Sequence, residues 1–416
     1  MNRRHSARAL AALAGLCAVV GCGGSAGSET GTTAASSSAG TSNHRCATDQ
    51  GPIKIGVTGP QSGLYAIVGD SQEAGLKLAV EELGDEGING RPVEVVSRDD
   101  KFSPTTAVSN FQQFVNRDGI CAMMGPTDTS STKAVAEAIE QLPDGPIPMV
   151  GTLGTDDVIA PDGPGSTPRP FAFGVLTGNW PELTILTNYV LENFEGKKVA
   201  IMHDPTDYGK NQADFALARL KEAGVEPVAT VSLPVNTADP GPQVNKVLDA
   251  GAEVVYTLVS FDDVARVAKA LRAAKSDAQI ICTDQCAVIP DFIKNAGPAA
   301  NGTISTKAAG TALEPTPELR AFSERYNKLT GYDAFPPPDW SLTTYDMARM
   351  LFDVWKKVGT DPQAVFAELE KIQNYKGLAC PNLSFSPTQH NSMGEADCYR
   401  IMVIEDEKPV LLEGQH

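Results

Sequence analysis

Short apolar runs alternate with amphipathic stretches from Pro52 onward, and this alternation predicts the fold. Residues 53–58 form a β-branched run typical of a buried strand. In the stretch that follows, Leu76, Ala79, Val80 and Leu83 recur at i, i+3, i+4 and i+7, which is one face of an α-helix. The same alternation predicts further strands at 92–97, 121–125 and 147–151, and helices at 105–117 and 130–141. Such a rhythm is typical of a parallel, doubly wound sheet with right-handed crossovers.

The alternation restarts after residues 171–177, which predicts a second lobe of the same α/β construction. The expected helices are 181–194, 211–223, 241–250 and 262–274, and the expected strands are 198–203, 228–233, 254–260 and 279–283. Residues 304–416 are too few for a third sheet. We therefore expect them to return and complete the first two, with helices near 316–330 and 341–359.

The first 22 residues have the order of a lipoprotein signal peptide. Three arginines precede an apolar run at 9–20, which is too short for a membrane helix of roughly 20 residues. The run ends in Val19-Val20-Gly21-Cys22, so we expect diacylglycerol on the Cys22 thiol; an ordinary secretory leader is the alternative. Residues 23–51 begin with a stretch rich in Gly, Ser, Thr and Ala, typical of a flexible linker. We expect a protein anchored by lipid to the outer face of the cell membrane.

The charge and the cysteines agree with export. A formal net charge of −17 argues against nucleic acid, whose phosphates need Lys and Arg. Of eight cysteines, Cys17 would leave with the leader and Cys22 would carry lipid, so six remain and predict three disulfides. Among the fifteen pairings, position along the chain favours Cys46–Cys121, Cys282–Cys286 and Cys380–Cys398. Zinc is the alternative, but no second close Cys or His pair accompanies Cys282 and Cys286, so we expect no metal.

Candidate binding loops follow the predicted strands, because ligands of open parallel sheets bind beyond the carboxyl ends of the strands. In the first lobe these loops are 59–65, 125–132 and 151–155, rich in glycine and small hydroxylic residues. At helix starts such residues offer N–H groups, hydroxyls and a positive helix end to a carboxylate. Helix capping uses the same residue types. Helix capping is the simpler explanation for any one loop. Because three such loops lie in equivalent places, both capping and carboxylate binding remain open.

The second lobe offers different chemistry at 203–209, 260–262 and 283–285. Asp284 suits an ammonium group, and Tyr208 suits an aromatic wall with a polar tip. The alternative for these acids is a solvated loop, which we expect for Asp262 and Asp263. The sequence contains no phosphate loop, Gly-x-Ser-x-Gly elbow or His-Glu-x-x-His motif. We therefore expect a binding protein without catalytic activity or cofactor.

The motifs together resemble a known family. Residues 53–57 with the following Gly-Pro-x-Ser-Gly, residues 87–91 and Gly125-Pro126 are similar to type I periplasmic binding proteins, especially the leucine/isoleucine/valine-binding branch. The resemblance runs from about Pro52 to the end. It implies two lobes joined by three crossovers, a ligand trapped by hinge closure, and delivery to an ABC permease. We place the crossovers near 174–177, 305–309 and 384–388, giving an N-terminal lobe of 52–175 plus 308–384 and a C-terminal lobe of 176–307 plus 385–416.

The resemblance also implies site residues. In relatives that bind α-amino acids, the first lobe holds the carboxylate from loops that match Thr129 and 153–155. The second lobe supplies an acid for the amine, matching Asp284, and an aromatic ring, matching Tyr208. Side-chain pocket positions match Tyr65 or Val68, Ser260 or Phe261, and Trp340. The expected ligand-binding residues are Tyr65, Thr129, Ser130, Leu153, Thr155, Tyr208, Ser260, Phe261, Asp284 and Trp340.

Two departures from the family pattern leave the ligand open. Asp284 is one methylene shorter than the Glu of branched-chain amino acid binders, and it lies between Cys282 and Cys286. Asp156-Asp157 brings negative charge close to the expected carboxylate site. We expect a monomer that binds a small amino-acid-like solute, with amides, urea-like solutes and aromatic acids as alternatives. A sensor of the same fold without transport is the alternative to import.

Overall fold

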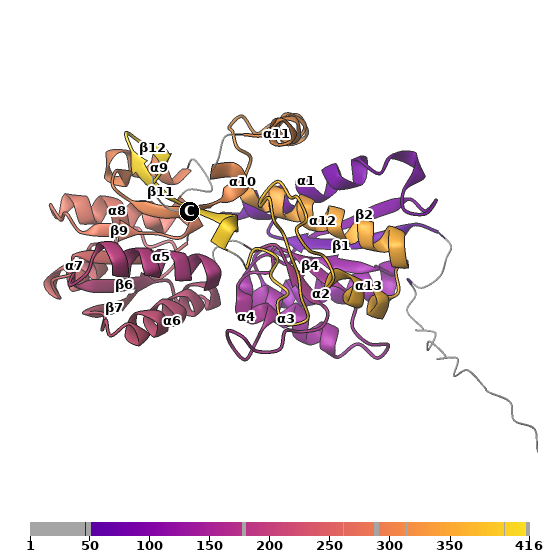
Figure 1. Cartoon of the computed structure of the whole chain (residues 1–416), viewed down its shortest axis with the longest axis horizontal. Helices are drawn as coiled ribbons and strands as arrows, with labels where there is room; N and C mark the ends of the chain where they lie inside the picture. Colours follow the sequence, from indigo (N-terminus) through magenta and orange to yellow (C-terminus); the bar gives the residue numbers. More distant parts are fainter. Residues whose placement is uncertain are drawn as a thin grey trace, which may run out of the picture. The chain divides into compact units, whose positions relative to one another are not determined.

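The computed structural model describes residue 46 and residues 51–176, 180–260, 262–286, 291–312, 315–394 and 396–412. The predicted signal peptide with Cys22, most of the predicted linker and Phe261 lie outside the described residues. The chain forms two α/β lobes, each built on one sheet, and its C-terminal part contributes to both (Figure 1). Within the described ranges, no helix combines the length and apolar character needed to cross a membrane.

The sheet of the first lobe has five parallel strands in the order β2-β1-β3-β4-β5. They are β1 (Ile53–Gly59), β2 (Val93–Asp99), β3 (Ala122–Met124), β4 (Met149–Gly151) and β5 (Ala172–Gly174). Ile53, Ile55 and Val57 are all buried, as expected of strands with helices on both faces. The strand order reverses between β1 and β3, so the loops after these two strands diverge and leave a crevice between them.

Helices from both ends of the chain cover this sheet. They are α1 (Ala66–Glu81), α2 (Pro104–Gln113), α3 (Thr129–Glu140), α4 (Asp156–Ile159), α11 (Pro317–Thr330), α12 (Asp339–Val358) and α13 (Pro362–Leu369). The long helix α12 lies among elements of the N-terminal part (Figure 1). It packs so closely on α1 that a Cβ added at Gly75 would lie 2.2 Å from the Ser341 carbonyl oxygen. The returning segment is therefore part of the first-lobe core.

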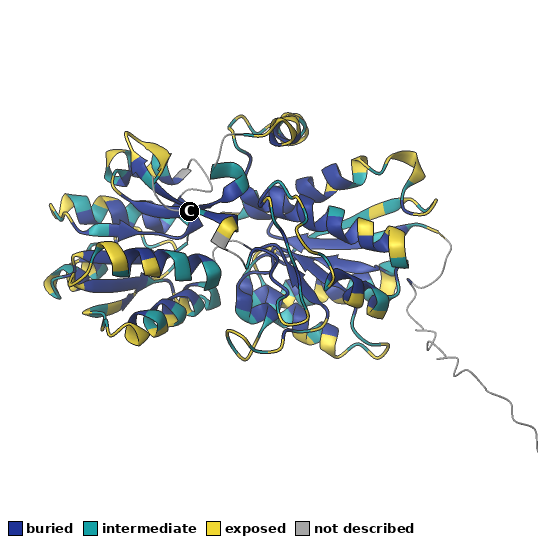
Figure 2. Cartoon of the chain, viewed as in Figure 1, coloured by how far each residue is buried: buried dark blue, intermediate teal, exposed yellow. Residues whose placement is uncertain are grey.

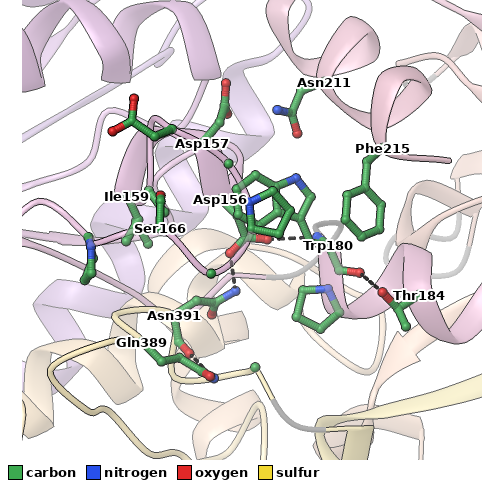
Figure 3. A pocket seen from close by; sticks show the side chains of 18 of the residues that line it. Asp156, Asp157, Ile159, Ser166, Trp180, Thr184, Asn211, Phe215, Gln389 and Asn391 are labelled. Carbon is green, nitrogen blue, oxygen red and sulfur yellow. Dashed lines mark hydrogen bonds between the residues drawn. The ribbon is translucent and has the colours of Figure 1, made fainter. Parts of the chain in front are cut away.

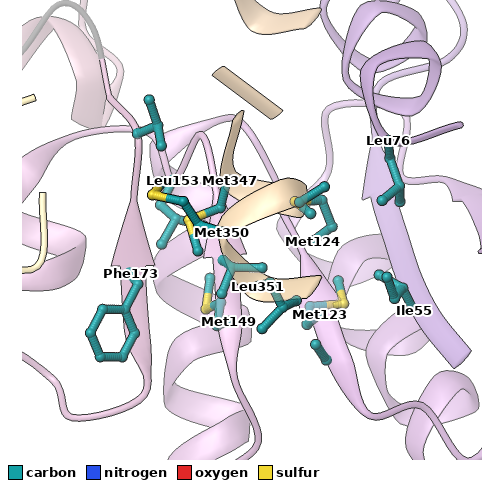
Figure 4. Packing of buried hydrophobic residues seen from close by; sticks show 14 of the residues in the cluster. Ile55, Leu76, Met123, Met124, Met149, Leu153, Phe173, Met347, Met350 and Leu351 are labelled. Carbon is teal, nitrogen blue, oxygen red and sulfur yellow. The ribbon is translucent and has the colours of Figure 1, made fainter. Parts of the chain in front are cut away.

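Methionines fill much of the contact between α12 and the sheet (Figure 4). Met123 and Met149 come from β3 and β4, and Met347 and Met350 come from α12; all four are fully buried. Unbranched methionine adapts to irregular gaps, which suits a junction between segments more than 190 residues apart in sequence. The surfaces turned away from the sheets carry most of the exposed residues (Figure 2).

The sheet of the second lobe has seven strands in the order β12-β11-β10-β9-β8-β6-β7. They are β6 (Val199–His203), β7 (Ala229–Ser232), β8 (Val254–Leu258), β9 (Gln279–Ile281), β10 (Ile304–Ala308), β11 (Tyr399–Glu405) and β12 (Lys408–Leu411). The surrounding helices are α5 (Trp180–Asn193), α6 (Asp207–Glu222), α7 (Gly241–Asp249), α8 (Asp262–Ala273) and α9 (Asp291–Ala296), with the short α10 (Ala309–Ala312) after β10. Strands β6 to β10 pair in parallel, and their order reverses between β6 and β8.

The last two strands form an antiparallel hairpin on the edge of this sheet. Asp406 and Glu407 make its two-residue turn, with φ of 48° and 58°. Two positive φ values are typical of a type I′ hairpin turn, which Asn-Gly usually marks. Asp406-Glu407 is not a typical sequence for such a turn. The sequence pattern therefore did not predict this hairpin.

The third connection between the lobes lies later than the expected 384–388. Residues 385–394, which we assigned to the second lobe, contact the first. Gly174 N donates to the His390 carbonyl at 2.8 Å, and Ser392 N donates to the Gly174 carbonyl at 2.8 Å. Phe385 and Met393 belong to the first-lobe core. The segment stays with the first lobe because it pairs with the free edge of β5, and the chain passes to β11 only after Gly394.

The structure contains the three expected disulfides, Cys46–Cys121, Cys282–Cys286 and Cys380–Cys398. Their Cα–Cα distances are 5.1, 6.0 and 4.9 Å, within the range that a disulfide spans without backbone movement. Cys46–Cys121 ties Cys46 to the residue that precedes β3 of the first sheet, and Cys282–Cys286 encloses the loop that carries Asp284.

Candidate functional site

A cavity of about 200 Å³ lies where the reversal points of both sheets face each other. This is the position at which open α/β sheets bind ligands, and the volume suits a solute smaller than the drug-sized ligands of ~300–1,000 Å³ pockets. The first-lobe segment contributes Val68, Phe102, Pro104, Thr127, Asp128, Thr129, Ser130, Thr152, Gly154 and Trp340. The second-lobe segment contributes Thr206, Tyr208, Ser260, Asp284 and Gln285.

The structure brings together most of the expected site residues. The ones that line the cavity are Thr129, Ser130, Tyr208, Ser260, Asp284 and Trp340. Leu153 does not, because it is fully buried in the first-lobe core (Figure 4). Thr155 lies behind the cavity wall, with its hydroxyl 3.4 Å from the Thr129 hydroxyl. Phe261 lies outside the described residues.

Tyr65 lies one layer outside the cavity lining. Its ring stacks on Phe102, which does line the cavity, with ring centroids 4.2 Å apart. Burial, and then the carboxylates of Asp204 and Asp263, raises the pKa of Tyr65 to about 12. The alternative expected at this position, Val68, lines the cavity directly.

The first-lobe wall is built around the start of α3. Asp128 is the N-cap residue, and its Oδ1 accepts a hydrogen bond from Ser131 N at 2.9 Å. Gly154 (φ +74°) brings the loop after β4 against this helix end, since an added Cβ would lie 2.7 Å from Thr129 Cα. Only glycine allows both that backbone conformation and that approach. Thr129, Ser130 and the loop after β4 therefore form one continuous wall.

Two polar atoms of this wall are buried and have no hydrogen-bond partner within the described part of the chain. They are Thr127 Oγ1 and Asp128 Oδ2. Burial raises the pKa of Asp128 even though hydrogen bonds from Ser131 act to lower it, and the charge of Asp207 adds a smaller increase. Buried polar atoms almost always have a partner, so these two mark where a ligand would find one. Neither residue was predicted individually, although both lie in the loop 125–132.

The second-lobe wall is held by Asp204, a fully buried carboxylate. Its Oδ1 accepts from Thr206 N at 3.0 Å and from the Thr206 hydroxyl. Its Oδ2 accepts from the Ser260 hydroxyl at 2.6 Å. One carboxylate thus joins the loops after β6 and β8, although the two loops are 56 residues apart.

Asp284 is fixed in the same manner by another buried acid. The backbone N–H of Asp284 donates to Glu182 Oε1 at 2.6 Å, and the Thr306 hydroxyl donates to the same oxygen. Burial, and then the carboxylates of Asp284 and Glu182, raises the pKa of Tyr208 well above its usual value. Tyr208 therefore stays protonated and can donate a hydrogen bond.

A buried pair of charged residues lies close to Asp284. Asp339 at the start of α12 is fully buried, and desolvation raises its pKa to about 7 although Lys307 of β10 opposes the shift. The charge of Asp284 also contributes to the raised pKa of Asp339. Because Trp340 follows Asp339, the aromatic wall of the cavity begins directly beside this pair.

The two aspartates expected to disturb a carboxylate site lie outside the cavity lining. Both line a separate groove of about 1100 Å³, where the oxygens of Asp156 accept from Asn391 Nδ2 at 2.9 Å and from Trp180 N at 2.8 Å (Figure 3). Burial raises the pKa of Asp156 to about 6. Asp157 accepts from Thr155, and Lys133 pairs with it at 2.6 Å. The charge of Asp157 is thus compensated locally.

The expectation that Asp263 is a solvated loop acid is wrong. Asp263 is 2% exposed, accepts from the N–H groups of Asn236 and Thr237, and pairs with Arg266 at 2.7 Å. It fixes the loop after β7, which the sequence pattern alone does not reveal. Asp262 is partly exposed and accepts from Asn295 at 2.9 Å.

Comparison with known proteins assigns the family. The periplasmic binding protein family model matches residues 52–408. The chain belongs to this family, and its two lobes with parallel sheets have the type I periplasmic binding protein fold.

Three similar proteins illustrate the relationship. An amino acid binding protein of Pseudomonas aeruginosa is 27% identical over 350 residues, covering 80% of this chain and 85% of the relative. The crystal structure of a type 1 periplasmic binding protein from Bordetella pertussis has a TM-score of 0.77 at 25% identity, covering 87% of this chain and 99% of that one. A branched-chain amino acid transporter substrate-binding protein of Streptococcus pneumoniae, in complex with isoleucine, has a TM-score of 0.71 at 21% identity, covering 87% and 99%.

Proposed function

We propose that this chain is the extracytoplasmic solute-binding component of an ABC importer. It is anchored through lipid on Cys22, captures a small amino-acid-like solute between its lobes by hinge closure, and delivers the solute to the permease. The observation that carries this proposal is the cavity between the two reversal points, with hydroxyls and a helix start on one wall and Asp284 on the other.

The opposite chemistry of the two walls suits a zwitterion. The start of α3 offers the N–H groups and hydroxyl of its first turn, together with the positive end of the helix dipole, to a carboxylate. Asp284 offers an acceptor for the ammonium group, and Tyr208 beside it is a protonated donor. Val68 and Trp340 pack together next to these groups and offer apolar surface to a side chain.

Relatives support the same class of ligand. The Pseudomonas aeruginosa relative is named for amino acid binding, and its similarity covers most of both chains. The Streptococcus pneumoniae structure holds isoleucine. The shorter Asp284 and the disulfide around it argue against carrying branched-chain specificity over to this chain.

The direct test is Asp284→Ala in a thermal-shift screen over amino acids, amides and carboxylic acids, since a ligand of the folded state raises the melting temperature. The unchanged chain should be stabilised by amine-bearing solutes. Asp284→Ala should abolish that stabilisation and leave any shift from simple carboxylates in place. The exposed Asp239, changed to Ala, is the matched control and should bind as the unchanged chain does. Equal losses for amines and carboxylates would remove Asp284 from the amine-binding role.

A further inference from the structure

The charges that line the cavity are all negative. Asp128 and Asp284 contribute carboxylates, and no Lys, Arg or His is among the described residues of the lining. A zwitterionic amino acid with an aliphatic side chain needs one carboxylate for its ammonium group, the role given above to Asp284. An aliphatic amino acid therefore has no group that needs the second carboxylate, that of Asp128.

Asp128 has acceptor capacity left after it caps α3. Its Oδ1 serves the cap by accepting from Ser131 N, while its Oδ2 is buried without a hydrogen-bond partner in the described structure. An aliphatic ligand group placed there would leave that oxygen desolvated and unpaired, which is unfavourable. A ligand N–H placed there would satisfy it.

Several hydroxyl groups of the lining also act toward a ligand only as hydrogen-bond acceptors. Ser130 donates its hydrogen to Asp207 Oδ2 at 3.0 Å, and Ser260 donates to Asp204 Oδ2 at 2.6 Å. Thr206 also donates to Asp204. A hydroxyl has one hydrogen and two lone pairs, so these side chains can only accept from a ligand. The donors that remain in the lining include the Thr127, Thr129 and Tyr208 hydroxyls and the Gln285 amide. Together with the N–H groups at the start of α3, they suit the single carboxylate of an amino acid.

We propose that the cavity selects an amino-acid-like solute whose side chain ends in an N–H donor, an amide or an amine, and that it discriminates against acidic and aliphatic side chains through Asp128. The proposal rests on the proposed function and specifies its ligand class. Ser130, Ser260 and Thr206 supply additional acceptors within the cavity.

Calorimetric titration of the full chain with glutamine, glutamate, leucine, ornithine, putrescine and glutarate tests this selection. Glutamine and glutamate have nearly the same shape and differ in whether the side-chain end donates or carries negative charge. Glutamine or ornithine should bind roughly 10- to 100-fold more tightly than glutamate or leucine. Whichever of glutamine and ornithine binds more tightly shows whether the preferred side-chain donor is neutral or cationic.

Asp128→Asn keeps a good N-cap while it removes the charge and one acceptor oxygen. It should reduce the preference for glutamine over glutamate about tenfold or more. Asp361→Asn is the matched control, because Asp361 caps α13 with the same hydrogen bond at 3.0 Å and does not line the cavity. The Asp361→Asn variant should keep the preference for glutamine over glutamate that the unchanged chain has.

The outcomes separate this inference from the proposed function. Leucine binding more tightly than glutamine and ornithine, or an unaltered preference in Asp128→Asn, would overturn the inference and leave amino acid capture intact. Putrescine binding without any amino acid would overturn amino acid capture and support donor selection. Tightest binding of glutarate, or no binding of any of the six solutes, would contradict both.

Discussion

The two walls of the cavity are held in place by different physical means. The first-lobe wall depends on close backbone approach, in which Gly154 lets the loop after β4 touch Thr129. The second-lobe wall depends on buried carboxylates, since Asp204 joins Thr206 to Ser260 and Glu182 holds Asp284. The first wall is thus fixed by sterics and the second by hydrogen bonds to charge. Substitutions that add volume should damage the first wall, and substitutions that remove charge should damage the second.

The largest effect is expected for Asp204→Ala, which removes the acceptor of three hydrogen bonds. Hydrogen bonds to charged groups contribute ~1.5–3 kcal/mol each, and they are not additive. We expect the free energy of unfolding to fall by about 4 kcal/mol, measured by urea denaturation, with loss of ligand binding. Asp239→Ala removes an exposed carboxylate that accepts one hydrogen bond from Gly241 N, and should change stability by less than about 0.5 kcal/mol. Similar losses in the two variants would argue against a special role of Asp204.

Gly154→Ala should have the next largest effect, because it adds a Cβ against Thr129 at a residue with φ of +74°. Backbone strain and overpacking together should cost about 3 kcal/mol and weaken binding. Gly165→Ala has nearly the same φ, +77°, with nothing within 4 Å of the added Cβ, and should cost only about 1 kcal/mol. The difference between the two variants measures the steric part alone. If it vanished, the close approach of the loop to α3 would not define this wall.

Removal of the Cys282–Cys286 disulfide by serine substitution of both residues should act more on binding than on stability. The disulfide closes a loop with a sequence separation of 4, against 18 for Cys380–Cys398. Chain-entropy estimates give about 2 kcal/mol for the shorter loop and about 3 kcal/mol for the longer one. Only the shorter loop carries Asp284, so its loss should weaken amine-bearing ligands, whereas loss of Cys380–Cys398 should leave affinity unchanged. Affinity and unfolding should both be measured, and the opposite pattern would contradict this assignment.

The smallest effect concerns the charge beside the first wall. Lys133→Met leaves Asp157 without its ion pair, which should cost about 0.5 kcal/mol of stability. The uncompensated charge lies next to Thr155, so the affinity for carboxylate-bearing ligands should fall about two- to threefold. Lys197→Met breaks an exposed pair with Glu253 in the second lobe and should not alter affinity. Equal affinities of both variants would show that Asp157 does not influence the site.

Local pattern was sufficient for most of the parallel strands, although not for β5 and β10, and for much of the cavity wall. The strands predicted at 53–58 and 198–203 correspond to β1 and β6, and the loops after the strands bring Thr129, Ser130 and Asp284 to one cavity. The start of a parallel strand and the loop after it can be predicted because both depend on neighbouring residues. The hairpin of β11 and β12 could not, since its turn lacks the usual Asn-Gly.

Long-range pairing explains what the sequence did not reveal. Asp204 and Glu182 contact residues 56 and 102 positions away, so no local pattern identifies them as supports of the site. Leu153 and Thr155 lie in the expected loop but face the core and the back of the wall. Which residue of a loop faces a cavity depends on one or two backbone angles, here the positive φ of Gly154, and these are set by packing against another helix.

Amide hydrogen exchange of the full chain, with and without a saturating mixture of the twenty common amino acids, tests capture between the two walls most directly. The cavity predicts slower exchange in the presence of the mixture at residues 127–132 of the first wall and at residues 282–286 of the second. Capture between the two walls would be contradicted by protection of only one wall, by protection confined to residues 159–166 of the separate groove, or by no change in exchange at all.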